Sequence, residues 1–247
     1  MNSNGKTASI DDVSQQKIAR IAGLAFLFIV IGYTLTWIFV YSKLIVAGNA
    51  QATANNIMAN ESLSRIGIAG DLMIAISSLV LAWALYILLK PVNKNLALLA
   101  LYLKLTDAIL ATVTVSFSFI SLQILNGEAY LTVFKPEQLQ YLVGLFLNMH
   151  TSASTIPMVF TGLGFIVFFY LLFKSNYVPR ILASFGIFSY LSLLTYVFVK
   201  ILVAQPATDL LSNIELIFYL PSVLFELIIG FWLLIKGVNV QEKEGYS

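Results

Sequence analysis

Long apolar runs joined by short polar links dominate the pattern of the chain. Six runs reach the roughly 20 residues that a helix, at 1.5 Å per residue, needs to cross the hydrocarbon core of a bilayer. Only the links 47–65 and 126–138 are polar enough to be loops of any size. The pattern therefore predicts an all-α, polytopic membrane protein with six transmembrane helices. The runs cover residues 21–46, 66–90, 96–125, 152–174, 180–203 and 213–236.

One run departs from helical periodicity. Residues 111–119, ATVTVSFSF, alternate with period two, which in a water-soluble chain indicates a β-strand. A lone strand in lipid would leave its backbone N–H and C=O groups unpaired, at a cost of several kcal/mol each. We therefore expect this segment to be helical.

The composition agrees with a membrane protein and excludes several functions. Charged residues make up 11% of the 247 residues, against roughly 25% in soluble domains. A net charge of +2 is too small to indicate nucleic-acid binding. The chain has no cysteine and one histidine, so disulfides, thiolate chemistry and multi-histidine metal centres are excluded. We expect no metal, no cofactor and no catalytic residue.

Basic residues predict the orientation. With a cytoplasmic N-terminus, nine of the fourteen Lys and Arg residues lie in the inner tails and links, four lie outside, and Lys104 lies within a span. Because cytoplasmic loops carry the excess of basic residues, both termini should be cytoplasmic. We expect a polar tail over 1–20, one transmembrane domain over 21–236, and a second tail over 237–247.

Short similarities suggest an internal repeat. Three spans end in YILLK (86–90), YLLFK (170–174) and WLLIK (232–236). In addition, YTLTWIFVYSKLIVA (33–47) parallels YLSLLTYVFVKILVA (190–204). Two explanations stay open: three duplicated helical hairpins, or the general gathering of aromatic residues and lysines at membrane interfaces.

The third run carries charges where lipid is expected. Lys104 and Asp107 are followed at helical steps by small and hydroxyl residues, which form one face suited to helix packing. Helical rise places Lys104, Asp107 and Glu226 roughly 12, 16 and 15 Å from the inner ends of their helices. Each charge costs about 2.5 kcal/mol or more there. We expect Lys104 to pair either with Asp107 along the helix or with Glu226 across helices.

Further polar residues lie toward the outer side. Asp71 and His150 are predicted to line an outer entrance, and Pro157 should kink the helix that follows His150. Glu61 and Arg65 have the i,i+4 spacing of an ion pair at the rim. The segment KPEQLQYLVGLF, residues 135–146, should form either an interfacial helix or an extension of the fourth span.

Five sequence blocks carry a resemblance: NESLSRIGIAGDL, LYILLKPVNKNLALLALYLKLTDA, KPEQLQYLVGLFLNMH, FYLLFKSNYVPRILA and FELIIGFWLLIKGVN. From about residue 15 to 240, the chain resembles the prokaryotic membrane family known as domain of unknown function 4386. The resemblance implies a multi-helix protein of a prokaryotic plasma membrane, and brings no activity, substrate or cofactor. It also implies polar residues at Asp71, Lys104, Asp107, His150 and Glu226. Arg and Glu are commoner in the family at the positions of Lys104 and Asp107, so the charge signs persist while the bidentate geometry of Arg does not.

The leading hypothesis is an intramembrane polar site that binds a small ligand, an ion or a lipid headgroup, for transport or sensing. Lys104 would counter an anionic group, while Glu226 and Asp107 would set its protonation. The second hypothesis is an accessory protein whose charges fix helix register and whose partner is another membrane protein. The third is an enzyme acting on membrane lipid, which ranks lowest because the sequence marks no nucleophile.

Overall fold

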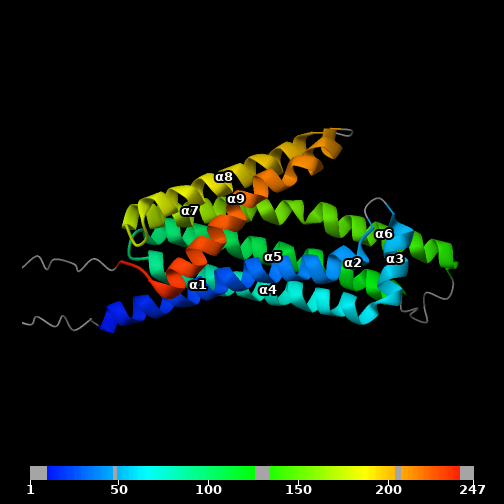
Figure 1. Cartoon of the computed structure of the whole chain (residues 1–247), viewed down its shortest axis with the longest axis horizontal. Helices are drawn as coiled ribbons and strands as arrows, with labels where there is room; N and C mark the ends of the chain where they lie inside the picture. Colours follow the sequence, from blue (N-terminus) through cyan, green and yellow to red (C-terminus); the bar gives the residue numbers. More distant parts are fainter. Residues whose placement is uncertain (1–9, 47–48, 126–133, 204–206, 240–247) are drawn as a thin grey trace, which may run out of the picture.

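The computed structural model describes residues 10–46, 49–125, 134–203 and 207–239, and these residues form helices joined by short links (Figure 1). Six stretches within them are long and apolar enough to cross a membrane, namely Val13–Leu44, Glu61–Leu89, Lys94–Leu125, Tyr141–Ser175, Arg180–Leu202 and Ile214–Ile235. The predicted all-α fold with six spans is confirmed. The elements are α1 (Ile10–Thr36), the π-helical η1 (Trp37–Tyr41), α2 (Ser42–Leu44), α3 (Ala50–Ala59), α4 (Glu61–Leu89), α5 (Lys94–Leu125), α6 (Pro136–Ala153), α7 (Thr155–Ser175), α8 (Arg180–Leu202) and α9 (Ala207–Ile235).

The spans pack as a closed ring in chain order. α1 packs on α4, α4 on α5, α5 on α7, α7 on α8 and α8 on α9, and α9 returns to α1. The four-residue links 90–93 and 176–179 explain two of these contacts, because a short link forces consecutive helices to lie antiparallel beside each other. The ring places the inner faces of all six spans around one common axis.

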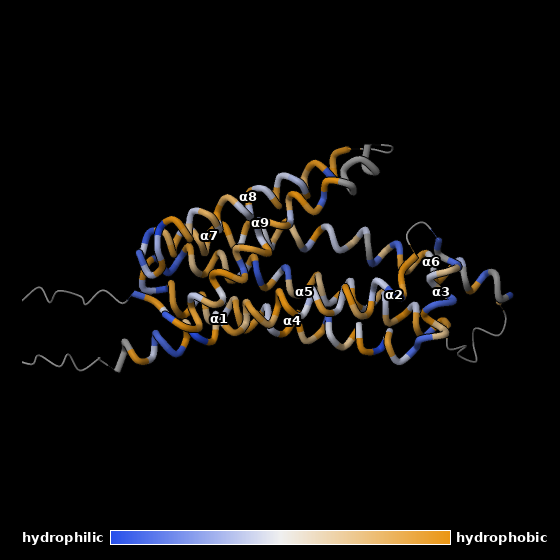
Figure 2. The backbone as a smooth tube through the Cα atoms, viewed as in Figure 1, coloured by the Kyte–Doolittle hydropathy of each residue, from blue (hydrophilic) through white to orange (hydrophobic). Residues whose placement is uncertain are grey.

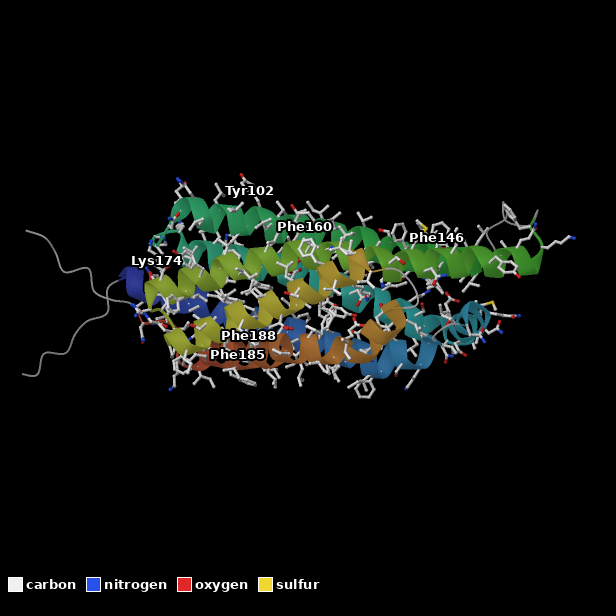
Figure 3. The ribbon with its side chains drawn as sticks, turned by 90° about the horizontal axis from the view of Figure 1, so that it is seen from above. Tyr102, Phe146, Phe160, Lys174, Phe185 and Phe188 are labelled. Atoms are coloured by element: carbon white, nitrogen blue, oxygen red, sulfur yellow. The ribbon has the colours of Figure 1, made fainter. Side chains whose placement is uncertain are left out.

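Both ends of the transmembrane domain lie at the same end of the bundle. Gln16 Nε2 donates a hydrogen bond of 2.6 Å to the carbonyl of Val238, and the N–H of Asn239 donates to the carbonyl of Tyr177 at 2.9 Å. Lys174 lies at this end in Figure 3. We call it the terminal end, and the opposite end the far end. The cytoplasmic location of the terminal end stays a prediction, and so does the internal repeat of three helical hairpins.

The distribution of hydropathy follows the expected bilayer. Figure 2 shows apolar residues along the middle of the spans and hydrophilic residues toward both ends of the bundle. The link 47–65 is an exception to the sequence prediction, because it holds the helix α3 and the start of α4. Asn49 caps α3, its Oδ1 accepting from the N–H of Ala52 at 2.9 Å. Polarity there reflects exposure to water and not a lack of helix.

Three local predictions about helices are tested. Residues 111–119 lie within α5, so the alternating segment is helical. The helix α6 runs through a single residue, Ser154, into α7, so the segment from Lys135 extends the fourth span. The interruption at Ser154 lies three residues before Pro157, close to the predicted kink. Of the expected tails 1–20 and 237–247, residues 1–9 and 240–247 lie outside the described residues, and residues 10–20 form the first turns of α1.

The terminal half of the ring is filled by an apolar core that contains Phe26, Phe165, Phe169 and Phe225. Glycines allow the helices to meet there. A Cβ on Gly23 would lie 2.6 Å from the backbone N of Leu234 and 2.7 Å from the carbonyl O of Gly230, closer than real Cβ atoms come. Only glycine at this position lets α1 and α9 make backbone contact, and this contact closes the ring at the terminal end.

Candidate functional site

Beyond the aromatic core, the ring encloses a cavity of about 490 Å³. Its walls come from all six spans, because α1 with η1, α4, α5, α6 with α7, α8 and α9 each contribute lining residues. The five residues that the sequence singled out all line it, although they come from four different helices: Lys104, Asp107, Asp71, His150 and Glu226. The structure thus gathers in one place charges that are up to 155 residues apart in the chain (71 to 226).

Lys104 is held by α5 and α7. Its Nζ lies 2.5 Å from Asp107 Oδ2 and 4.3 Å from the ring centre of Phe165. Its side chain is 3% exposed and its stem runs over Gly164, where a Cβ would lie 3.0 Å from Lys104 Cγ. Tyr102, two residues away, is 58% exposed and points outward in Figure 3. Of the two expected pairings, the structure shows the one along the helix.

Glu226 lies where the aromatic core meets the cavity. The hydroxyl of Tyr190 in α8 donates a hydrogen bond to Glu226 Oε1 in α9. Tyr190 itself is 1% exposed and packs on Phe165 and Phe169, with ring centres 4.8 and 5.5 Å away. The carboxyl is therefore held at a fixed position by a side chain that the core immobilises.

Asp71, which also lines the cavity, has a similar partner. The hydroxyl of Tyr41, in the π-helical turn η1, donates to Asp71 Oδ2 in α4. A π-helical turn holds an additional residue and changes which side chains face inward. This turn brings Tyr41 to the cavity wall, so that two of the three carboxyls are each held by a tyrosine from a neighbouring span.

His150 links α6 to α5. Its Nδ1 lies 2.9 Å from the carbonyl O of Thr114 and 3.1 Å from Ser118 Oγ. A carbonyl oxygen only accepts, so Nδ1 carries a proton and Nε2 is the acceptor in the neutral ring. His150, Asp71 and Glu226 each bond to other side chains or to backbone, and not to one another. Among the described residues, the three side chains therefore share the cavity without a direct hydrogen bond between any two of them.

The cavity contains functional groups that the sequence interpretation missed. Tyr33, Tyr41, Tyr190, Tyr219 and Phe165 all line it. The sequence did mark two of these tyrosines, since Tyr33 and Tyr190 are the first residues of the similar segments 33–47 and 190–204. Apolar periodicity alone does not distinguish an aromatic residue in a core from one at a cavity wall.

The α1 side of the cavity is open. Tyr33 and Trp37 line the cavity yet are 56% and 62% exposed. Leu216 and Ile217 of the neighbouring α9 are also exposed. Figure 1 shows the α8–α9 hairpin diverging from the other spans toward the far end. The opening therefore faces the side of the bundle, where the bilayer would lie.

Comparison with known proteins identifies a family. The sequence profile of the family described as "Domain of unknown function (DUF4386)" matches residues 21–237. No curated protein and no solved structure matches the chain. The matched range contains every residue that lines the cavity.

Proposed function

Because the chain belongs to the family described as domain of unknown function (DUF4386), which carries no assigned activity, we propose its function from the cavity: the protein binds a small molecule within the membrane, for transport or sensing. One observation carries the proposal. All five ionisable residues predicted from the sequence line a single cavity of about 490 Å³ between the six spans.

The size and lining of the cavity support ligand binding. Pockets for small molecules usually measure about 300–1,000 Å³ and combine apolar walls with a few polar groups. Here the walls are mainly aromatic and aliphatic, and the polar groups converge from four helices. Charges within a membrane are costly and usually mark a ligand or ion path. As the resemblance implies, we place the protein in the plasma membrane of a prokaryote, with membrane lipid around it.

The accessory role is the second candidate. Two contacts favour it, since Tyr41–Asp71 joins η1 to α4 and Tyr190–Glu226 joins α8 to α9. Such cross-helix bonds fix register whether or not a ligand binds, and the partner would be another membrane protein. The pair Lys104–Asp107 does not fit this role, because both residues lie on α5 and a pair within one helix cannot align two helices.

Native mass spectrometry of the protein, extracted gently from its own membrane, tests the proposal. We expect a bound species in the wild type and its loss in Asp71→Asn and in Glu226→Gln, because both carboxyls line the cavity. The ion pair Lys200–Glu215, 3.8 Å long and about one-third exposed, provides matched controls on α8 and α9. Lys200→Met and Glu215→Gln should retain the bound species, because neither residue lines the cavity.

The contrary result is equally distinct. If wild-type protein carries no bound species, and Asp71→Asn and Glu226→Gln lower the unfolding temperature while the two controls do not, the accessory role is favoured. The intramembrane charges would then serve the packing of the ring.

A further inference from the structure

The charges that line the cavity do not balance. Three carboxyls, one ammonium and one imidazole face it. The ammonium of Lys104 is already neutralised by Asp107 at 2.5 Å. Among the described residues, Asp71 and Glu226 have only uncharged tyrosine hydroxyls as hydrogen-bond partners. The cavity therefore holds an excess of negative charge in its ionised form.

Both remaining carboxyls also have unused hydrogen-bonding capacity. An ionised carboxylate offers two oxygens with about four acceptor sites. Tyr41 occupies one site on Asp71 Oδ2 and Tyr190 one on Glu226 Oε1. The second oxygen of each has no hydrogen-bond partner in the part of the chain that the structure describes. A ligand that donates protons or carries positive charge would satisfy these atoms.

The aromatic walls favour the same sign of charge. Phe26, Tyr33, Trp37, Tyr190 and Tyr219 line the cavity, and the faces of aromatic rings attract cations. Phe165 already does so, with the ammonium of Lys104 4.3 Å from its ring centre. Metal ions suit the cavity less well, since no group of three or more Asp, Glu or His residues with metal-binding geometry occurs among residues 10–46, 49–125, 134–203 and 207–239.

We infer that the cavity takes an apolar organic cation, in which the carboxyls of Asp71 and Glu226 counter an ammonium or other onium group and an apolar body packs on the aromatic walls. The inference rests on the proposed function and names the class of its ligand. It also replaces the hypothesis that Lys104 counters an anion, because that charge is taken up by Asp107. The side opening at Tyr33 and Trp37 suits a ligand that partitions into the bilayer.

Two matched pairs of probes test the sign of the charge on purified protein in lipid nanodiscs. Tetraphenylphosphonium and tetraphenylborate have nearly the same size and shape but opposite charge. Benzyltrimethylammonium and neopentylbenzene form a smaller pair, of which one is a cation and the other its neutral analogue. We expect saturable binding of a cation that is about tenfold or more tighter than that of its matched partner.

Variants then locate the binding site. Asp71→Asn and Glu226→Gln should each weaken binding of the cation by about tenfold or more, because each removes one countercharge. Glu215→Gln, on the same helix as Glu226 but outside the cavity, should leave the affinity unchanged.

Each remaining outcome overturns the inference. Tighter binding of tetraphenylborate would show a site for anions, and equal binding of neopentylbenzene and benzyltrimethylammonium would show a purely apolar site. Binding of neither cation would also reject the inference. The native mass spectrum of untreated wild-type protein separates these failures from failure of the proposed function, because it reports any bound species whatever its charge.

Discussion

The terminal half of the ring and the cavity beyond it are built from the same six helices, yet they differ in what fills the space between them. In the terminal half, α1 and α9 meet at Gly23 and Gly230, and phenylalanine rings occupy the interior. In the cavity half, α8 and α9 diverge from the other spans (Figure 1), and the interior holds charges in place of packed rings. Phe165 and Tyr190 lie on the boundary and belong to both halves.

This difference shows two ways in which a membrane helix bundle is stabilised. The closed half depends on shape, because tight packing of small and aromatic residues replaces the hydrophobic effect that lipid does not supply. The cavity half depends on pairing, because each buried charge must find a partner or become neutral. The closed half should therefore respond to changes in volume and the cavity half to changes in charge.

The largest effect is expected from breaking the buried ion pair. Lys104→Met leaves Asp107 without its partner in a site where both side chains are nearly inaccessible, and should lower the free energy of unfolding by about 3–5 kcal/mol. Adding Asp107→Asn should recover most of this loss. Unfolding in detergent, followed by circular dichroism, measures both; a double variant no more stable than the single one would contradict the pairing.

Removal of one tyrosine hydroxyl gives the next largest effect. Tyr190→Phe deletes the hydrogen bond to Glu226 and should cost about 1.5–3 kcal/mol in unfolding free energy. Tyr33→Phe is the matched control, since Tyr33 lines the same cavity but its hydroxyl makes no hydrogen bond among the described residues, and it should change stability by less than about 0.5 kcal/mol. Equal losses in the two variants would show that the contact with Glu226 contributes nothing.

A single methyl group should disturb the closed half. Gly23→Ala places a Cβ 2.6 Å from the backbone N of Leu234, so α1 and α9 must separate at a cost of about 1–3 kcal/mol. Gly162→Ala meets the side chain of Leu194 alone, 3.2 Å from its Cδ1 and 3.4 Å from its Cβ, and should be tolerated after a small shift of that side chain. Thermal unfolding of the two variants side by side decides the point; wild-type stability of Gly23→Ala would refute the close helix contact.

The smallest effect is expected at an ion pair outside both regions. Arg65 and Glu61 lie 2.7 Å apart with side chains 49% and 43% exposed, and exposed i,i+4 pairs contribute only about 0.3–0.5 kcal/mol. Arg65→Gln should thus change the unfolding temperature far less than Lys104→Met. If Arg65→Gln lowered the unfolding temperature as much as Lys104→Met, burial would not determine how much an ion pair contributes to stability.

The sequence predicted secondary structure correctly within the spans, where the need to pair backbone groups in lipid outweighs other preferences. Lipid forces every backbone N–H and C=O to bond within its own helix, so residues 111–119 are helical despite their alternating pattern. The link 47–65 escaped this rule because it lies outside the spans, and its polarity did not reveal α3. The three-residue spacing of Lys104 and Asp107 allowed these two residues to pair. The similar depths of Lys104 and Glu226 in the membrane equally allowed a pair across helices, so the sequence did not decide between the two.

The sequence by itself determined that the chain forms six spanning helices and which charges lie within them, because helix length and the cost of burying a charge depend only on local composition. The tertiary structure decided which of these charges share a space. The cavity takes its walls from all six spans, including Tyr41 of the turn η1, and so exists only in the packed ring. Cavity walls arise from helices far apart in the chain, so no local pattern records which tyrosine holds which carboxyl.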